Sequence, residues 1–164
     1  MERIIDVAQF IFDEYKNMSG NSIDEMKLHK LLYLSQRECL ALLGQPLFSE
    51  TFEGWKYGPV SRTVRTEYTE DGMACSTSPI SMEAAYIVKN ILSQYGIYES
   101  WELSKLTHKE KSWLKSRIGL SAVDNGNRTI PTDDIREDAK KVRPYDSVWD
   151  MYYDEFESVE VNET

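Results

Sequence analysis

The sequence predicts a mainly α domain of the α+β class, in which about six helices surround a central Leu-rich helix and a small antiparallel β element lies near residues 47–57. Apolar side chains recur at the three-and-four residue spacing of amphipathic helices in several separate segments. Residues 23–43 carry apolar side chains on more than one side, so we expect this helix at the centre. Between residues 47 and 57 the pattern changes to an alternation that favours strands.

The N-terminal part is expected to form two helices. Residues 4–16 follow the helical period, and the turn-forming residues 17–21 end the first helix. Ser22 and Glu25 have the spacing of a capping box, in which the two side chains accept hydrogen bonds from free backbone N–H groups at the helix start. We therefore expect Ser22 to cap the long central helix, which ends before Gly44.

The chain after the central helix is expected to be extended and then to turn. Gly58 and Pro59 break the alternating run and are expected to turn the chain, and Ser61 is expected to cap a short helix. Residues 69–81 are rich in small and polar side chains. We expect them to form a flexible connection.

The C-terminal part is expected to contain further helices. Residues 82–95 have the clearest helical period, and a short helix is expected around residues 101–106. Thr107 and Glu110 repeat the capping-box spacing, so another helix is expected to begin there. Thr132 is expected to cap the last helix of the core.

Charge is distributed unevenly along the chain, whose formal net charge is −9 at pH 7. Residues 144–164 contain seven Asp or Glu and no Lys or Arg, together with several aromatic side chains. We therefore predict a single domain over residues 1–143 and an acidic aromatic tail over residues 144–164. Binding to phosphate needs clustered Lys and Arg, so the sequence predicts no direct contact with nucleic acid.

The sequence also predicts no contact with a membrane. No apolar stretch approaches the length that spans a bilayer. The N-terminus lacks the apolar region and the cleavage site of a signal peptide. The two cysteines, Cys39 and Cys75, do not make the framework of a disulfide-rich secreted protein. We therefore expect a cytoplasmic protein.

The sequence predicts neither a metal site nor a cofactor. His29, expected to be a partly exposed helix residue, and His108 each lack a second ligand at metal-binding spacing. The glycines do not have the spacing of a phosphate-binding loop. No local signature supports a pairing of Cys75 with His108 as nucleophile and base. No catalytic residue is predicted, and an enzyme is the weakest functional hypothesis.

The run from Trp55 to Val60 has two interpretations. In the first, Trp55 and Tyr57 lie on the same side of a strand and close the core. In the second, Lys56 on the opposite side joins its exposed neighbours in a recognition surface. Aromatic residues at strand period are usually part of a core, so their physical chemistry favours the first.

Four short sequence blocks are far more specific in their order than any one of them alone. They are KLLYLSQ (residues 30–36), PLF (46–48), FEGWKYGPV (52–60) and LSKLTH (103–108), with a Trp following. Together they resemble the SocA-like Panacea domain family, whose members are similar to KLLYFAQ, PLF, FEAWKYGPV and LSxLTH. The likeness runs from about residue 4 to about residue 142. The motif positions that we expect to be structural are Leu31, Leu32, Tyr33, Trp55, Gly58, Pro59, Thr107 and Trp113.

The chain departs from the family pattern at three places. Leu34 and Ser35 stand where the family has an aromatic residue and Ala, the connection over residues 68–81 is not recognisable, and the tail falls outside the likeness. Many members carry an additional N-terminal DNA-binding domain. The family-like helix here begins almost at Met1, so we expect this chain to lack one.

The resemblance implies an antitoxin, which is encoded beside a toxin and neutralises it by direct binding. Family members pair with very different toxins, and prophages often encode them. The resemblance implies no catalytic residues and no cofactor. One branch of the family acts as an adaptor that delivers its toxin to a bacterial protease, and this is the first alternative. The second alternative is an acidic mimic that occupies a basic, nucleic-acid-binding partner through the tail.

The partner-binding residues are expected on exposed positions around the third and fourth blocks and in the tail. A recognition surface of this kind combines cationic and aromatic side chains. The residues expected to contact the partner are Lys56, Tyr57, Arg62, His108, Trp149, Tyr152 and Tyr153.

Overall fold

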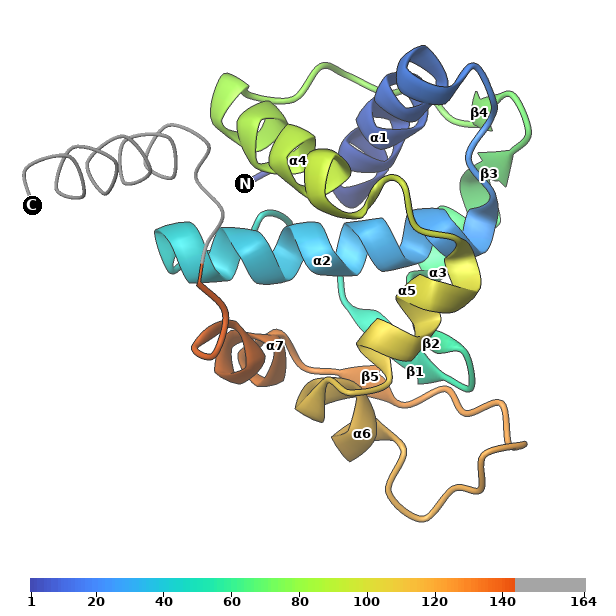
Figure 1. Ribbon diagram of the computed structural model, residues 1–164, viewed down its shortest axis with the longest axis vertical. Coiled ribbons are helices and arrows are strands. Elements are labelled where there is room, and N and C mark those ends of the chain that lie inside the picture. Colours follow the sequence, from blue (N-terminus) through green and yellow to red (C-terminus); the bar gives the residue numbers. More distant parts are fainter. Residues whose placement is uncertain (144–164) are drawn as a thin grey trace, which may run out of the picture.

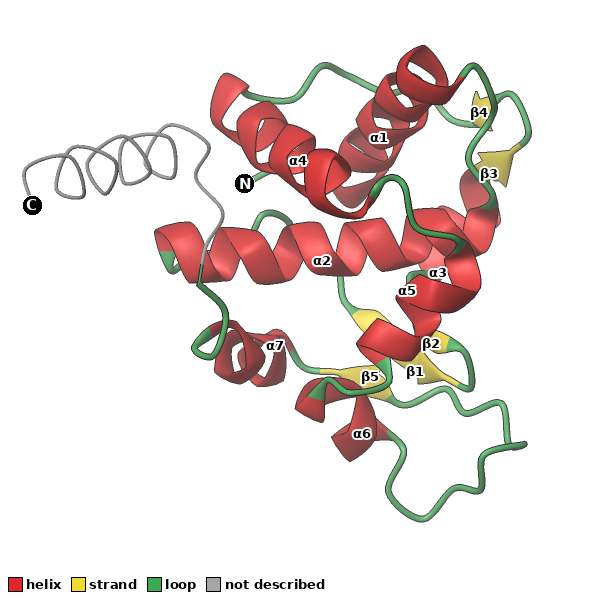
Figure 2. Ribbon diagram, viewed as in Figure 1, coloured by secondary structure: helices red, strands yellow, loops and turns green. Residues whose placement is uncertain are grey.

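A computed structural model describes residues 1–143 of the protein, in which helices surround one long central helix and short strands form two small sheets (Figures 1 and 2). The prediction of a mainly helical α+β fold is confirmed. In chain order the elements are α1 (Ile4–Ser19), α2 (Glu25–Leu43), β1 (Phe52–Trp55), β2 (Gly58–Val60), α3 (Arg62–Glu67), β3 (Tyr68–Thr69), β4 (Gly72–Met73), α4 (Met82–Tyr95), α5 (Ser100–Thr107), α6 (Lys111–Ser116), β5 (Thr129–Ile130) and α7 (Thr132–Ala139).

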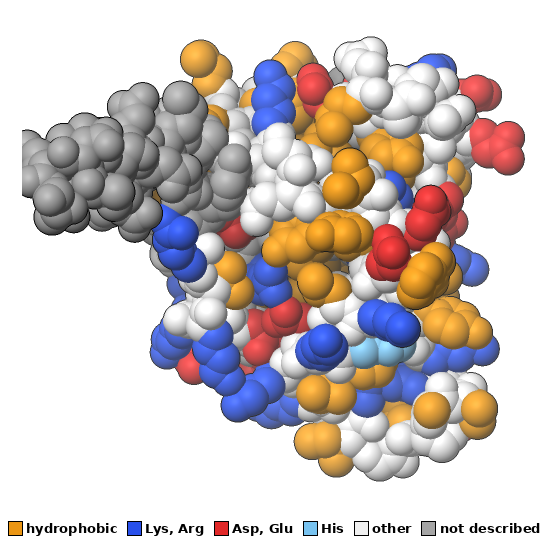
Figure 3. Space-filling model, in the orientation of Figure 1, with side chains coloured by type: hydrophobic (Ala, Val, Ile, Leu, Met, Phe, Trp, Pro, Cys, Tyr) orange, Lys and Arg blue, Asp and Glu red, His pale blue; other side chains and the backbone are white. Residues whose placement is uncertain are grey.

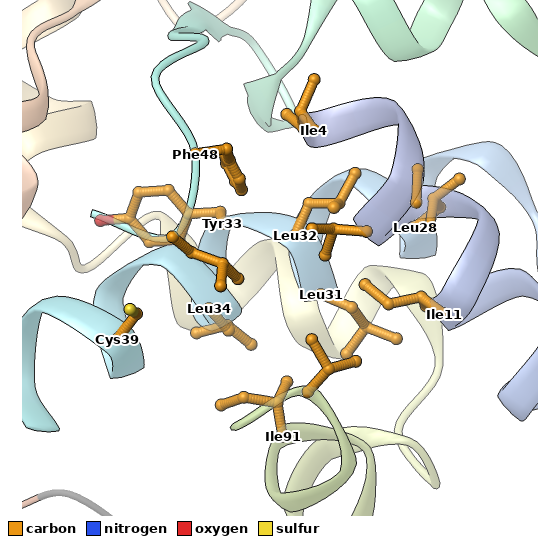
Figure 4. Close-up of a cluster of buried hydrophobic side chains, with 14 of the residues drawn as sticks. Ile4, Ile11, Leu28, Leu31, Leu32, Tyr33, Leu34, Cys39, Phe48 and Ile91 are labelled. Carbon is orange, nitrogen blue, oxygen red and sulfur yellow. The ribbon is translucent and has the colours of Figure 1, made fainter. Parts of the chain in front are cut away.

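Helix α2 is the centre of the fold, as its apolar pattern predicts. Helices α1 and α4 pack on one side of it, whereas α5, α7 and the sheet that contains β1 pack on the other (Figure 1). Every residue from Lys27 to Leu40 is buried. Figure 4 shows Leu28, Leu31 and Leu32 of this helix gathered with Ile4 and Ile11 of α1 in the core. Because α2 is covered on both sides, its polar residues are also buried and need partners.

The start of α2 differs from the sequence prediction. Asp24 is the N-cap, and its side chain accepts a hydrogen bond of 2.8 Å from the backbone N–H of Lys27. The prediction that Ser22 caps this helix is therefore wrong. Asp is as good an N-cap as Ser, so the cap falls on the Asp directly before the first helical turn. Gly44 ends the helix in the left-handed conformation, as expected.

The larger sheet has the strand order β2-β1-β5, with antiparallel pairing throughout. The turn between β1 and β2 lies at Lys56 and Tyr57, because Trp55 pairs with Gly58. Gly58 and Pro59 are therefore strand residues, and the prediction that they turn the chain is wrong. Strand β5 comes from far along the sequence and pairs with β1, which carries the C-terminal part of the chain onto this hairpin.

The connection over residues 69–81 is partly regular. Strands β3 and β4 form a two-stranded antiparallel hairpin that contacts α1. The backbone N–H of Met73 donates to Gln9 Oε1 at 2.8 Å. The expectation of a wholly flexible connection is therefore wrong at its first residues, because a side chain of α1 binds the backbone of the hairpin.

The last helices are capped differently from the prediction. Thr107 ends α5, and Glu110 precedes α6 without a side-chain cap. Asp138 of α7 instead accepts from the first backbone N–H groups of α6, those of Lys111 and Ser112, at 3.1 and 2.9 Å. This cap comes from a distant segment, so its partner could not be found from local spacing.

Helix α7 also starts differently. It begins at Thr132 itself, and Pro131 is its N-cap.

No helix within residues 1–143 is both long enough and apolar enough to cross a membrane.

Candidate functional site

Residues from three of the sequence blocks meet beneath the β1–β2 hairpin. Lys30 of α2 reaches the hairpin, where its Nζ donates to the carbonyl oxygen of Pro59 at 3.3 Å. Gly58 has a φ of 120°, and a Cβ at this position would lie 2.6 Å from Lys30 Cε and 2.8 Å from Thr107 Oγ1. Only glycine fits there without displacing a neighbour. The close approach of Lys30, Gly58 and Thr107 therefore joins the three blocks that contain them in space.

A second set of contacts fixes the hairpin from below. The indole Nε1 of Trp113 donates to the carbonyl oxygen of Trp55 at 2.8 Å. The ring of His108 stacks on Trp113 with a centroid separation of 4.2 Å and an interplanar angle of 9°. Burial lowers the pKa of His108, and the charge of Lys30 acts in the same direction. His108 therefore serves first as part of the support of the hairpin.

A pocket of about 410 Å³ opens between the start of α2, the hairpin and α3, and we call it the motif pocket. Its walls are largely apolar, with charged groups at its base and rim. The residues that line it are Glu25, Met26, His29, Lys30, Trp55, Lys56, Tyr57, Val60, Arg65 and Asn125. A concave, mostly apolar site with a few polar groups is typical of a binding site.

His29 lies at the base of the motif pocket and is only 1% exposed, so the prediction of a partly exposed residue is wrong. Its Nδ1 accepts from the backbone N–H of Ser61 at 3.2 Å, and its Nε2 lies 3.0 Å from Glu25 Oε2. This arrangement requires a neutral ring with the proton on Nε2. Burial lowers the pKa of His29, which favours the same state. His29 therefore fixes the start of α3.

Lys30 is the buried cation of the motif pocket, with 1% of its surface exposed. Within residues 1–143 its one hydrogen bond is to the Pro59 carbonyl, and no carboxylate lies within ion-pair distance of its ammonium group. Burial lowers its pKa to about 8. An ammonium group carries three donors, so two of them have no acceptor within residues 1–143.

Trp55 forms one wall of the pocket and carries cations on its ring. The guanidinium carbons of Arg62 and Arg65 lie 5.6 and 4.9 Å from the Trp55 ring centroid. Arg62 is paired with Glu53, and Arg65 with Glu25 at 3.0 Å. The Trp55 indole nitrogen is buried and has no hydrogen-bond partner among the described residues.

Tyr57 does not close the core. It lies in the turn of the hairpin and is 54% exposed, so the first interpretation of the Trp55–Val60 run is wrong for this residue. The ammonium group of Lys56 lies 5.1 Å from the centroid of the Tyr57 ring. The turn therefore presents an aromatic ring and a cation side by side at the rim of the motif pocket.

The loop between α4 and α5 and the start of α5 carry exposed apolar side chains. Figure 3 shows hydrophobic side chains gathered across the middle of the face where α4 leads into α5. Ile97 and Tyr98 of the loop and Trp101 of α5 are exposed. The sulfur of Met26, which lines the motif pocket, lies 3.7 Å from Oγ of Ser104 in the same helix α5. Apolar surface of this kind, bordered by polar residues, is typical of interaction sites.

The structure brings together only some of the predicted partner-binding residues. Lys56 and Tyr57 line the motif pocket, and Arg62 lies against its Trp55 wall. His108 supports the hairpin from α5. The predicted contacts Trp149, Tyr152 and Tyr153 lie outside the described residues. Sequence reasoning did not identify His29, Lys30, Met26 or Arg65 as parts of one pocket, although a lysine inside an apolar helix face was a signal for Lys30.

Residues 1–143 bring together neither a Cys75–His108 pair nor a set of metal ligands. Cys75 follows β4 beside α1, whereas His108 lies at the end of α5 on the other side of α2 (Figure 1). No three His, Cys, Asp or Glu side chains within this range are placed to hold a metal ion.

Comparison with known proteins adds one finding. Residues 28–114 match the family model described as the antitoxin SocA-like, Panacea domain. The matched segment runs from α2 into α6 and contains Lys30, the β1–β2 hairpin and Thr107. No curated protein and no solved structure matches the chain.

Proposed function

Since the chain belongs to the SocA-like Panacea family of antitoxins, we propose that it neutralises a cognate toxin by direct binding, with the motif pocket and its rim as the contact surface. The family implies a toxin as the partner in general. We take the partner to be the protein encoded beside this chain. The family and its fold do not specify which activity is blocked.

The observation that carries this proposal is the exposed Tyr57 at the rim of the motif pocket. Its ring contributes nothing to the core, although it sits on a hairpin that Lys30 and Trp113 hold in place. Tyr, Trp and Arg dominate binding energy at protein interfaces, and they do so best when they are positioned before binding. The pocket and its surroundings combine all three types, in Tyr57 at the rim, Trp55 in the wall and Arg62 against the Trp55 ring.

The test is co-expression of the chain with the protein encoded beside it. We expect that protein alone to arrest growth and the wild-type chain to restore it. Tyr57→Ala should weaken binding at least about tenfold, since it removes a central aromatic contact. Met82→Ala is the matched control, because Met82 is 91% exposed at the start of α4, far from the hairpin in Figure 1.

Two outcomes would contradict the proposal. A neighbouring protein that is harmless alone, or equally harmful with the chain present, would remove the antitoxin function for this pair. Equal effects of Tyr57→Ala and Met82→Ala on affinity would move the contact surface away from the motif pocket.

The same strains separate masking of the toxin from its degradation. We expect stoichiometric masking, in which the half-life of the toxin is unchanged or longer when the chain is present. A shorter half-life would instead support the protease-adaptor alternative. Deletion of residues 144–164, which lie outside the described residues, tests the acidic-mimic alternative, since full neutralisation by the shortened chain would exclude it.

A further inference from the structure

We infer that the motif pocket binds a carboxylate-bearing side chain of the partner, with the carboxylate on the Lys30 ammonium group and the apolar part of the partner segment against Met26, Trp55 and Val60. The inference deepens the proposed function and rests on it, because the toxin supplies the occupant. It names the chemistry by which the pocket would recognise that partner.

Lys30 has hydrogen-bond donors that no described residue accepts. The side chain is 1% exposed, yet among the described residues its ammonium group has one acceptor, the Pro59 carbonyl at 3.3 Å. Buried charges in proteins are normally paired, because desolvation without a partner is unfavourable. A carboxylate supplies the missing charge and accepts the free N–H donors in charge-assisted hydrogen bonds.

The lining of the pocket carries more positive than negative charge. Three cations, Lys30, Lys56 and Arg65, line it. The acidic group that lines it, Glu25, is already engaged by Arg65 and by His29, each at 3.0 Å. The histidine is neutral in this arrangement, so the lining carries an excess of positive charge. An anionic occupant is therefore favoured over a neutral or a cationic one.

The pocket also has apolar walls and room for more than a carboxylate alone. Met26, Trp55 and Val60 offer apolar surface, and the volume of about 410 Å³ is large enough for more than a single ion. The buried indole N–H of Trp55 is a further donor without a partner among the described residues. An occupant that joins an apolar body to a carboxylate uses both parts of the pocket, whereas a free inorganic anion uses only one.

The experiment uses 3-phenylpropionate as the probe and 3-phenylpropanamide as its uncharged counterpart. The indole N–H signals of the four Trp residues of the ¹⁵N-labelled full chain are followed by NMR, with Trp55→Phe to assign the Trp55 signal. At pH 7 we expect the acid to shift the Trp55 signal with an affinity at least tenfold higher than that of the amide. Equal affinities, or no shift of this signal at saturating concentrations, would overturn the inference.

Two further arms keep the test independent of a single variant. Lys30→Met should abolish the preference for the acid. In the wild type, the preference should fall at pH 9.5, where Lys30, with a pKa of about 8, has lost most of its charge. The other titratable groups around Lys30 are Glu25, His29, Lys56, Tyr57 and Arg65 of the pocket lining, together with Asp24 and His108. Their contributions remain in Lys30→Met, so an equal fall with pH in that variant would assign the effect to them and contradict the inference.

A last arm identifies the source of the carboxylate. If the probe binds at least tenfold more tightly after deletion of residues 144–164, the occupant is the acidic tail of the chain itself, and the assignment to a partner is overturned. We expect an unchanged affinity. Neutralisation in cells is measured separately, so a failed probe titration with intact neutralisation would reject this inference and leave the proposed function standing.

Discussion

Two buried polar regions flank α2, and they differ in how their charges are met. The first, which we call the polar cluster, consists of Tyr33, Arg37, Glu110, Ser112 and Asp138 and joins α2 to α6 and α7. The Tyr33 hydroxyl lies 2.8 Å from Ser112 Oγ and donates to Asp138 Oδ2 at 3.3 Å, while Arg37 pairs with Glu110. Each charged group in the polar cluster faces an opposite charge or a hydrogen-bond donor, and one buried donor of the cluster, Arg37 Nε, has no hydrogen-bond partner among the described residues.

The motif pocket is the second region, and there the one acceptor for Lys30 in the described part of the chain is the Pro59 carbonyl. Both regions are buried against the same helix and both contain residues of the sequence blocks. We infer from this difference that a buried polar group with its partners in place supports the fold, whereas one that lacks partners indicates a binding site for a ligand. The two regions should therefore respond in opposite ways to substitution.

The largest effect is expected from Asp138→Ala in the polar cluster. This change removes the acceptor for Tyr33 and for the free backbone N–H groups at the start of α6, and it should lower the free energy of unfolding by about 3 kcal/mol. Urea denaturation measures it. Glu137→Ala, which removes an exposed partner of Lys140 on the same helix, should leave the midpoint unchanged. Equal effects of the two changes would show that the polar cluster does not stabilise the fold.

A smaller loss is expected from Gly58→Ala beneath the hairpin. The added Cβ meets Lys30 Cε and Thr107 Oγ1 as well as an unfavourable φ, so the free energy of unfolding should fall by about 2 kcal/mol. Gly20→Ala is the matched comparison, since Gly20 has a φ of 78° and open space around it. It should cost about 1 kcal/mol. A loss no greater at Gly58 than at Gly20 would mean that the close approach of the three motif residues has no energetic consequence.

The smallest effect on stability has the opposite sign. Lys30→Met removes a buried charge that has no counter-ion within residues 1–143, so the free energy of unfolding should rise by about 1 kcal/mol at pH 7. Because the folded-state pKa of Lys30, about 8, lies below the ordinary value of 10.5, the folded wild type releases this proton first. Wild-type stability should therefore rise between about pH 8 and pH 10.5, and the rise should be smaller in the variant. A variant that is less stable than the wild type at pH 7 would show that Lys30 supports the fold.

Much of the fold follows from local patterns in the sequence. The helical periods of α1, α2 and α4 place these helices within a few residues of their observed bounds, and Ser61 caps α3 as predicted. Capping was wrong where more than one candidate lay close together, as with Ser22 and Asp24. It was also wrong where the cap comes from a distant helix, as Asp138 does for α6.

The candidate site was less accessible to sequence reasoning. Lys56, Tyr57 and Arg62 were predicted as contacts, and they lie on or beside the motif pocket. The pocket itself depends on β5 and α6, which support the hairpin from far along the chain, and on the burial of His29 and Lys30 by neighbours that no local spacing reveals. The ring of Tyr57 was expected in the core. It lies at the surface because Lys56 and Tyr57 form the two-residue turn of the hairpin.

The most direct test of toxin recognition by the motif pocket is the affinity of the purified neighbouring protein for the wild-type chain and for Lys30→Met, measured by calorimetric titration. The variant is predicted to be the more stable protein and the weaker binder, with an affinity at least about tenfold lower, because its pocket has lost the charge that holds the partner. An unchanged affinity in a correctly folded variant would contradict the assignment of the motif pocket as the site of toxin recognition.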